Sequence, residues 1–156
     1  MVAFTLNGAA VAAEAPGEAS LLHVLRGPVG LSGPRFGCGN EQCGSCMVLL
    51  DGAPAYACTL SLDAVAGRSV ETVEGLGDAV APHPLQQAFL EEQAGQCGYC
   101  LSGILVSAAA LLRRNPDPDV AAIREALQPH LCRCGSHNRI IRAIRRAAAA
   151  MREQVA

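Results

Sequence analysis

Four cysteines in the first half of the chain constrain its fold more than any other feature. They follow the spacing C-x4-C-x2-C-x11-C, at Cys38, Cys43, Cys46 and Cys58. Three thiols on one short loop can wrap a small inorganic group closely, and thiolates are ligands for both zinc and iron–sulfur clusters. Glycines at 37, 39 and 44 suit that wrapping, because glycine reaches positive φ and lets backbone N–H groups approach an anionic sulfur. The segment therefore predicts a metal or cluster loop around which the N-terminal half folds.

The spacing favours one of the two inorganic groups. The first three cysteines match the pattern by which plant-type ferredoxins hold a [2Fe-2S] cluster. A structural zinc site also uses four cysteines, but usually as two C-x2-C pairs on separate knuckles. We therefore predict a [2Fe-2S] cluster at this loop, with a structural zinc ion as the alternative.

The residues around the loop predict a small mixed sheet packed on one helix. Alternating apolar residues indicate the strands, two-residue turns containing glycine indicate the hairpins, and helical spacing indicates the helix. The predicted elements are a hairpin over 2–13 that turns at Asn7-Gly8, a helix over 21–25, a hairpin over 47–57 that turns at Asp51-Gly52, and a strand over 68–73. This is the layout of a β-grasp ferredoxin domain.

The second half of the chain predicts a helical bundle. A linker rich in glycine and proline, residues 75–84, precedes four stretches with helical spacing, at 85–89, 104–112, 120–127 and 140–151. Ser102, Asp117 and Ser136 are predicted to cap the second, third and fourth helices. The predicted fold class is α+β, with a β-grasp [2Fe-2S] domain over residues 1–76 and a four-helix bundle domain over residues 77–156.

The helical half contains the other four cysteines, Cys97, Cys100, Cys132 and Cys134. Each pair lies just before a predicted helix, so two helix N-termini would face one site. The partial positive charge of each end, worth ~0.3–1 kcal/mol, favours an anionic thiolate cluster. Two short cysteine pairs also suit a tetrahedral zinc ion. From spacing alone, a second cluster and a zinc site both remain open.

Composition and charge exclude several function classes. The chain of 156 residues is 51% hydrophobic and 17% charged, which indicates a globular protein. Its longest apolar run, residues 103–112, is far shorter than the ~20 residues of a membrane span. A net charge of −2 gives no general affinity for nucleic acid. The charges are nevertheless divided: residues 96–156 carry nine arginines and four acids, so the arginine face of the last helix suits an acidic partner subunit.

Eight cysteines without a secretory signal at residues 1–6 indicate metal or redox chemistry rather than disulfides. The expected location is cytoplasmic, with export only by carriage on a partner that bears a signal. Because each cysteine is required as a ligand, we predict no catalytic residue on this chain. His130 and His137 flank the last cysteine pair and are candidates to hydrogen-bond a cluster sulfur or a partner, whereas Tyr99 is expected to pack.

Three segments together carry a family resemblance: Cys38 to Cys58, Gln96-Cys97-Gly98-Tyr99-Cys100, and Leu131-Cys132-Arg133-Cys134-Gly135. In this order and separation they resemble the small iron–sulfur subunit of molybdenum hydroxylases of the xanthine oxidase family. The resemblance covers essentially the whole chain, and it implies that Cys97, Cys100, Cys132 and Cys134 bind a second [2Fe-2S] cluster. It also implies a large partner subunit that binds molybdopterin cytosine dinucleotide, with FAD or haem only on other subunits.

The resemblance further implies a direction for the electrons. They would enter from the pterin, against which Gln96 and Cys134 lie, and pass through the second cluster to the first. The alternative for Gln96 is that it only caps the end of the helix that starts near Leu85. This chain has Leu101-Ser102-Gly103 where many relatives have Thr-Pro-Gly, and Glu41 where many have Gly.

The Leu101-Ser102-Gly103 segment is more similar to the isoquinoline 1-oxidoreductase and nicotinate dehydrogenase branch than to the xanthine branch. The implied substrate is an N-heteroaromatic compound or an aldehyde, and the implied acceptor is either a FAD-binding medium subunit or a cytochrome c. Two other hypotheses remain: a free-standing electron carrier with two clusters, and an interaction module held together by zinc.

Overall fold

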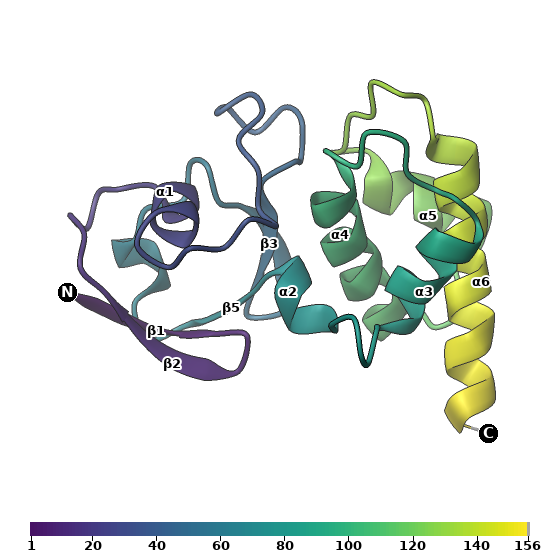
Figure 1. Cartoon of the computed structure of the whole chain (residues 1–156), viewed down its shortest axis with the longest axis horizontal. Coiled ribbons are helices and arrows are strands. Elements are labelled where there is room, and N and C mark those ends of the chain that lie inside the picture. Colours follow the sequence, from purple (N-terminus) through teal and green to yellow (C-terminus); the bar gives the residue numbers. More distant parts are fainter. Residues whose placement is uncertain (156) are drawn as a thin grey trace.

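The computed structural model describes residues 1–155, and it divides into a sheet-containing half and a helical half that lie side by side (Figure 1). The five strands form one sheet in the order β2-β1-β5-β3-β4. Strands β1 and β5 are parallel, whereas the other neighbours are antiparallel. The strands are β1 (Val2–Leu6), β2 (Ala9–Ala13), β3 (Met47–Leu50), β4 (Ala53–Tyr56) and β5 (Ser69–Glu71), with helix α1 (Leu21–Arg26) and a 3-10 turn, η1 (Asp63–Val65).

Both predicted hairpins are confirmed. Asn7 and Gly8 have φ values of 50° and 82°, and Asp51 and Gly52 have φ values of 49° and 83°. Positive φ at both central residues is the type I′ geometry that matches the twist of the flanking strands.

Strand β3 explains how the two halves adhere. All four of its residues are buried, because its two faces meet different partners. Val48 and Leu50 pack into the core formed by the sheet and α1, whereas Met47 and Leu49 pack against α4 (Leu101–Arg114). A four-residue apolar run without alternation is therefore a strand covered on both sides.

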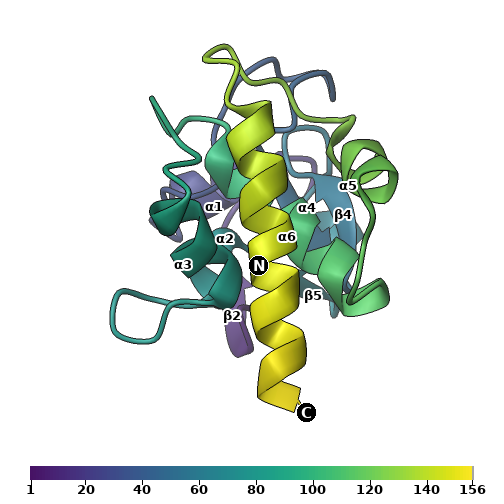
Figure 2. The same cartoon turned by 90° about the vertical axis from the view of Figure 1, so that its right-hand side faces the viewer.

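The helical half confirms the predicted bundle and adds one short helix. Helix α4 lies at its centre, with every residue from 102 to 112 buried. Its other helices are α2 (Val73–Leu76), α3 (Pro84–Glu91), α5 (Val120–Leu127) and α6 (His137–Val155). Helix α6 crosses the outside of the bundle and packs mainly on α3 (Figure 2). Within residues 1–155, none of the helices combines the length and apolar character that crossing a membrane requires.

The three predicted helix caps are wrong, for separate reasons. Asp119, not Asp117, caps α5, because it has the extended backbone of a cap and accepts the Ala122 N–H at 2.7 Å. Helix α4 starts at Leu101, so Ser102 falls inside its first turn. Ser136 does precede α6, but its buried hydroxyl has no hydrogen-bond partner among residues 1–155.

Candidate iron–sulfur centres

The loops that carry the cysteines gather at one end of the molecule. The blue loop that contains residues 38–46 and the green to yellow-green loops that contain residues 97–100 and 132–134 rise at the top of both views (Figures 1 and 2). None of the eight cysteines forms a disulfide. We call Cys38, Cys43, Cys46 and Cys58 the first cysteine set, and Cys97, Cys100, Cys132 and Cys134 the second cysteine set.

Within the first cysteine set the thiols lie in two pairs. The Cys43 side chain helps to lower the pKa of Cys38, and the Cys58 side chain adds to the burial that raises the pKa of Cys46, so the members of each pair are neighbours. The charge of Cys43 also acts on Cys46, so the pairs adjoin. Two adjoining pairs of thiols suit a cluster with two irons held by four thiolates.

Backbone donors prepare one of these thiols for ligation. The N–H groups of Asn40 and Gln42 point at Cys38 Sγ, at 3.5 and 3.2 Å, and they lower the pKa of Cys38 to about 7. Burial raises the pKa of Cys46 to about 12. Because a ligand must be deprotonated, cluster binding should release a proton from Cys46, whereas Cys38 is already partly deprotonated near neutral pH.

The second cysteine set repeats this arrangement. Cys97 pairs with Cys134 and Cys100 pairs with Cys132, so each pair joins one cysteine from the loop before α4 to one from the loop before α6. The Tyr99 N–H lies 3.5 Å from Cys97 Sγ and lowers the pKa of Cys97, whereas burial raises the pKa of Cys100 to about 12. Helix α4 starts directly after Cys100, and α6 starts shortly after Cys134, so both helix N-termini adjoin this set.

A Cys-Gly step recurs in both sets. The glycines after Cys38, Cys43, Cys97 and Cys134 have φ values of 73°, 73°, 77° and 72°, in that order: Gly39, Gly44, Gly98 and Gly135. A side chain disfavours this left-handed conformation, so glycine follows each of these cysteines. Sequence reasoning used only the glycines near the first set, although Gly98 and Gly135 gave the same signal beside the second.

Glu41 shows the same backbone geometry without being glycine. Its φ is 63°, within the cluster loop, and its carboxylate accepts a hydrogen bond from the Thr59 hydroxyl, next to Cys58. This bond ties the loop to the strand end that supplies the fourth cysteine. The departure at Glu41 therefore places a strained backbone and an anionic side chain at the exposed edge of the first set.

The residues present fit an iron–sulfur cluster at each set. Ser136 provides the clearest sign, because its N–H donates to Cys132 Sγ at 3.5 Å while its own buried hydroxyl lacks an acceptor. A buried hydroxyl without a partner costs ~1–3 kcal/mol, which an additional sulfur acceptor beside Cys132 would remove. Among residues 1–155, no three His, Cys, Asp or Glu side chains converge tightly enough to hold a single metal ion.

Gln96 and Cys134, which the family resemblance implies lie against the pterin, do lie together. Gln96 Nε2 donates to the Cys134 carbonyl at 3.3 Å, in an exposed position. Helix α3 ends at Glu91 and its last turn is capped by the Glu92 backbone. The alternative that Gln96 caps this helix is therefore wrong.

The two halves also meet directly between the cysteine sets. The Arg35 guanidinium donates to the Gly98 carbonyl at 2.6 Å and lies 5.3 Å from the centre of the Tyr99 ring. The Tyr99 hydroxyl donates to the Phe36 carbonyl. Tyr99 therefore packs, as expected, and its contacts join the segments that lead into Cys38 and out of Cys97.

His130 occupies the interior of the same junction. Its Nε2 lies 2.7 Å from Ser107 Oγ, not against a cysteine sulfur. Burial lowers the pKa of His130 to about 4, so the ring is neutral near neutral pH. Of the two candidate histidines, His130 is thus committed to an internal contact, and the role of His137 stays a prediction.

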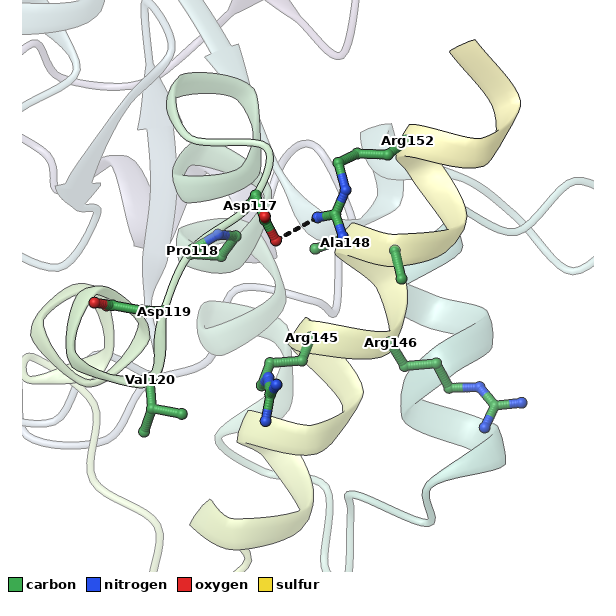
Figure 3. Close-up of a pocket in the computed structure, with 9 residues that line it drawn as sticks. Asp117, Pro118, Asp119, Val120, Arg145, Arg146, Ala148 and Arg152 are labelled. Carbon is green, nitrogen blue, oxygen red and sulfur yellow. Dashed lines mark hydrogen bonds and ion pairs between the residues drawn. The ribbon is translucent and has the colours of Figure 1, made fainter. Parts of the chain in front are cut away.

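The arginine face of α6 is largely neutralised by the chain itself. Arg152 pairs with Asp117 at 2.7 Å beside a shallow pocket between the start of α5 and α6 (Figure 3). Arg146 pairs with Glu91 at 2.6 Å. Arg145, which also lines this pocket, has no ion-pair partner among residues 1–155. The pocket contains no cysteine, and so it is separate from both cysteine sets.

Comparison with known proteins agrees with this geometry. Residues 4–70 match the 2Fe-2S iron-sulfur cluster binding domain family, and residues 72–145 match the [2Fe-2S] binding domain family. The two matches meet at residues 70–72, while the predicted domain boundary at 76 and 77 stays a prediction.

Relatives match along nearly the whole chain. One subunit of the nicotinate dehydrogenase of Pseudomonas putida is 47% identical over 97% of both chains. The alpha subunit of isoquinoline 1-oxidoreductase from Brevundimonas diminuta is 50% identical over 95% of this chain and 97% of that protein.

Solved structures share the fold. The crystal structure of quinoline 2-oxidoreductase from Pseudomonas putida 86 superposes with a TM-score of 0.92, at 38% identity over 97% of this chain and 95% of the matched chain. The aldehyde oxidoreductase from Desulfovibrio desulfuricans gives a TM-score of 0.94 at 38% identity, over 97% of this chain but only 17% of the matched chain. The chain therefore belongs to the family of small iron–sulfur subunits of molybdenum hydroxylases, with two [2Fe-2S]-binding domains.

Proposed function

We propose that this chain relays single electrons from a molybdopterin site on a large partner subunit, through two [2Fe-2S] clusters, to an acceptor beyond the first cysteine set. One observation carries the proposal: each set of four cysteines is arranged as two neighbouring pairs, and the loops that carry the two sets rise at the same end of the molecule (Figure 1). The eight cysteines of the two sets would be the ligands. Bound clusters supply one-electron redox chemistry at potentials that depend on hydrogen bonds and burial.

The chain itself would control how each cluster holds charge. Backbone N–H groups of Gln42 and Tyr99 point at ligand sulfurs and stabilise the negative charge that reduction increases. The N-termini of α4 and α6 add partial positive charge at the second set. Because the two sets differ in this way, the two clusters should differ spectroscopically.

Gln96 and Cys134 would form the entry point. Both lie at the edge of the second set, and the Gln96 side chain bonds to the Cys134 backbone. An amide offers donor and acceptor groups to a pterin edge without placing a further charge beside an anionic cluster. Molybdopterin cytosine dinucleotide would therefore approach the second set from the partner subunit.

The substrate class follows from the relatives. Proteins named for nicotinate, isoquinoline and quinoline match along nearly the whole chain, and an aldehyde oxidoreductase shares the fold. We propose that the assembled enzyme oxidises an N-heteroaromatic compound or an aldehyde, with the substrate bound by the large subunit. The acceptor would be either a FAD-binding subunit or a cytochrome c.

A first experiment separates this proposal from a free-standing carrier. Anaerobic purification of the tagged chain from its native host should retain a large molybdenum-containing subunit, with about four irons per small chain. Dithionite should produce two distinguishable [2Fe-2S] EPR signals. Full iron content without any large subunit would favour the carrier, and stoichiometric zinc without visible absorption would refute both.

A second experiment tests the entry point. In the assembled enzyme, Gln96→Ala should slow reduction of the second cluster by substrate but leave reduction by dithionite unchanged. Gln87→Ala is a matched control, because the Gln87 side chain bonds to Glu91 within α3. Unchanged substrate-driven reduction in the Gln96→Ala enzyme would remove Gln96 from the relay.

A further inference from the structure

The two cysteine sets are joined through a backbone hydrogen bond. The Leu131 N–H donates to the Cys43 carbonyl at 3.1 Å. Cys43 belongs to the first set, and Leu131 directly precedes Cys132 of the second. The two ligand segments therefore touch, and whatever holds them together also fixes how far apart the two sets lie.

A contact between two glycines lies behind this hydrogen bond. Gly103, in the first turn of α4, is pressed against the peptide between Gly44 and Ser45: a Cβ at Gly103 would lie 2.1 Å from the Gly44 carbonyl oxygen. An ordinary contact starts near 3.4 Å, so a methyl group would force the two segments apart by about 1.3 Å, the difference between these distances. Only glycine at position 103 permits this approach.

His130 fills the remaining space at the same contact. A Cβ at Gly44 would lie 2.4 Å from His130 Nδ1, so the ring lies directly against that glycine. Its other nitrogen is held 2.7 Å from Ser107 Oγ, one turn further along α4 than Gly103. The imidazole is thus clamped between the cluster loop and α4, and it is only 4% exposed.

We propose that Gly103, Ser107 and His130 form a spacer that fixes the distance between the two clusters and, through it, the rate at which an electron passes from one to the other. This inference rests on the proposed function, because it requires a cluster at each set. In the step concerned, one electron leaves the reduced cluster of the second set and reduces the cluster of the first, with no bond made or broken. These three are positioning residues, since none of them is itself a ligand.

The test compares variants in the full-length protein with both clusters present. The magnetic interaction between the two clusters, after complete reduction by dithionite, reports their separation and splits their EPR signals. Gly103→Ala should reduce this splitting and slow electron transfer between the clusters severalfold, measured after rapid photoreduction, at unchanged iron content. Ser107→Ala introduces no clash and removes only the hydroxyl that holds His130, so it should produce a smaller loss in the same direction.

Ser102→Ala is the matched control. Ser102 lies in the same turn of α4, and its buried hydroxyl has no partner among residues 1–155, so its removal should leave the splitting unchanged. If Gly103→Ala protein does not retain both clusters, Ser107→Ala decides the question. Unchanged splitting and rate in a spacer variant with full iron content, or an equal loss in Ser102→Ala, would overturn the inference. A parent protein without two [2Fe-2S] signals would instead refute the proposed function.

Discussion

The Cys-Gly steps allow a backbone effect to be separated from a packing effect. Gly98 and Gly44 both follow a cysteine and have nearly the same φ, 77° and 73°. Alanine at either position should cost about 1–2 kcal/mol, because a side chain disfavours left-handed backbone. At Gly98 nothing lies within 4 Å of an added methyl group, so this backbone cost is the whole effect.

At Gly44 the methyl group also collides with its surroundings. It would lie 2.4 Å from His130 Nδ1 and 2.7 Å from the Pro129 carbonyl. Forcing a methyl group into such a packed site typically costs a further ~1–3 kcal/mol. We therefore expect Gly44→Ala to destabilise the protein by roughly 2–5 kcal/mol, against about 1–2 kcal/mol for Gly98→Ala.

Urea unfolding under reducing, anaerobic conditions, followed by circular dichroism, measures this difference. With a slope of ~1–3 kcal/mol per molar urea, each 1 kcal/mol moves the midpoint by roughly 0.3–1 M. Gly135→Ala serves as a second backbone-only variant, because it too has open space around an added methyl group. Equal midpoints for Gly44→Ala and Gly98→Ala would show that the contact between Gly44 and His130 does not resist expansion, and the reasoning would fail.

Three further predictions concern single contacts. His83 Nδ1 accepts the backbone N–H at the start of α3, and burial keeps the pKa of His83 below the usual 6.5, so this cap, worth ~1 kcal/mol, should be present above pH 6.5 and lost as the pH falls below it. His83→Asn supplies a cap that does not titrate, so it should remove the pH dependence in thermal melts taken on either side of pH 6.5. Ser136→Ala should lower the reduction potential of the second cluster by an amount equivalent to ~1 kcal/mol, because it removes a buried donor. An EPR redox titration measures this potential, and the potential of the first cluster, which should not change, is the internal control. Glu71→Gln removes the ion pair with Arg113 at 2.7 Å, but both side chains are partly exposed, so the unfolding free energy should fall by only ~0.2–1 kcal/mol. This loss should shrink with added salt, and a larger loss that is insensitive to salt would contradict this account.

The local elements were predictable where one short segment contains the whole cause. Asn7-Gly8 and Asp51-Gly52 predict their hairpins because positive φ at two adjacent residues is a property of those residues. Helix caps were less predictable, since several polar residues compete near each helix start. Asp119 caps α5 in place of Asp117 because of the extended backbone that it adopts after Pro118, and the sequence does not reveal this conformation.

The sequence by itself determined which cysteines are available, how they group along the chain, and that glycine must follow four of them. These are properties of spacing and of backbone sterics, and neither depends on distant residues. Only the tertiary structure decided which thiols pair, because Cys97 meets Cys134 across a long stretch of chain, where α6 packs on α3. It also decided that Gly103 faces Gly44 and that His130 turns to Ser107. The first contact joins the two halves and the second holds His130 against Gly44 at their junction, so both depend on residues that are distant in the sequence.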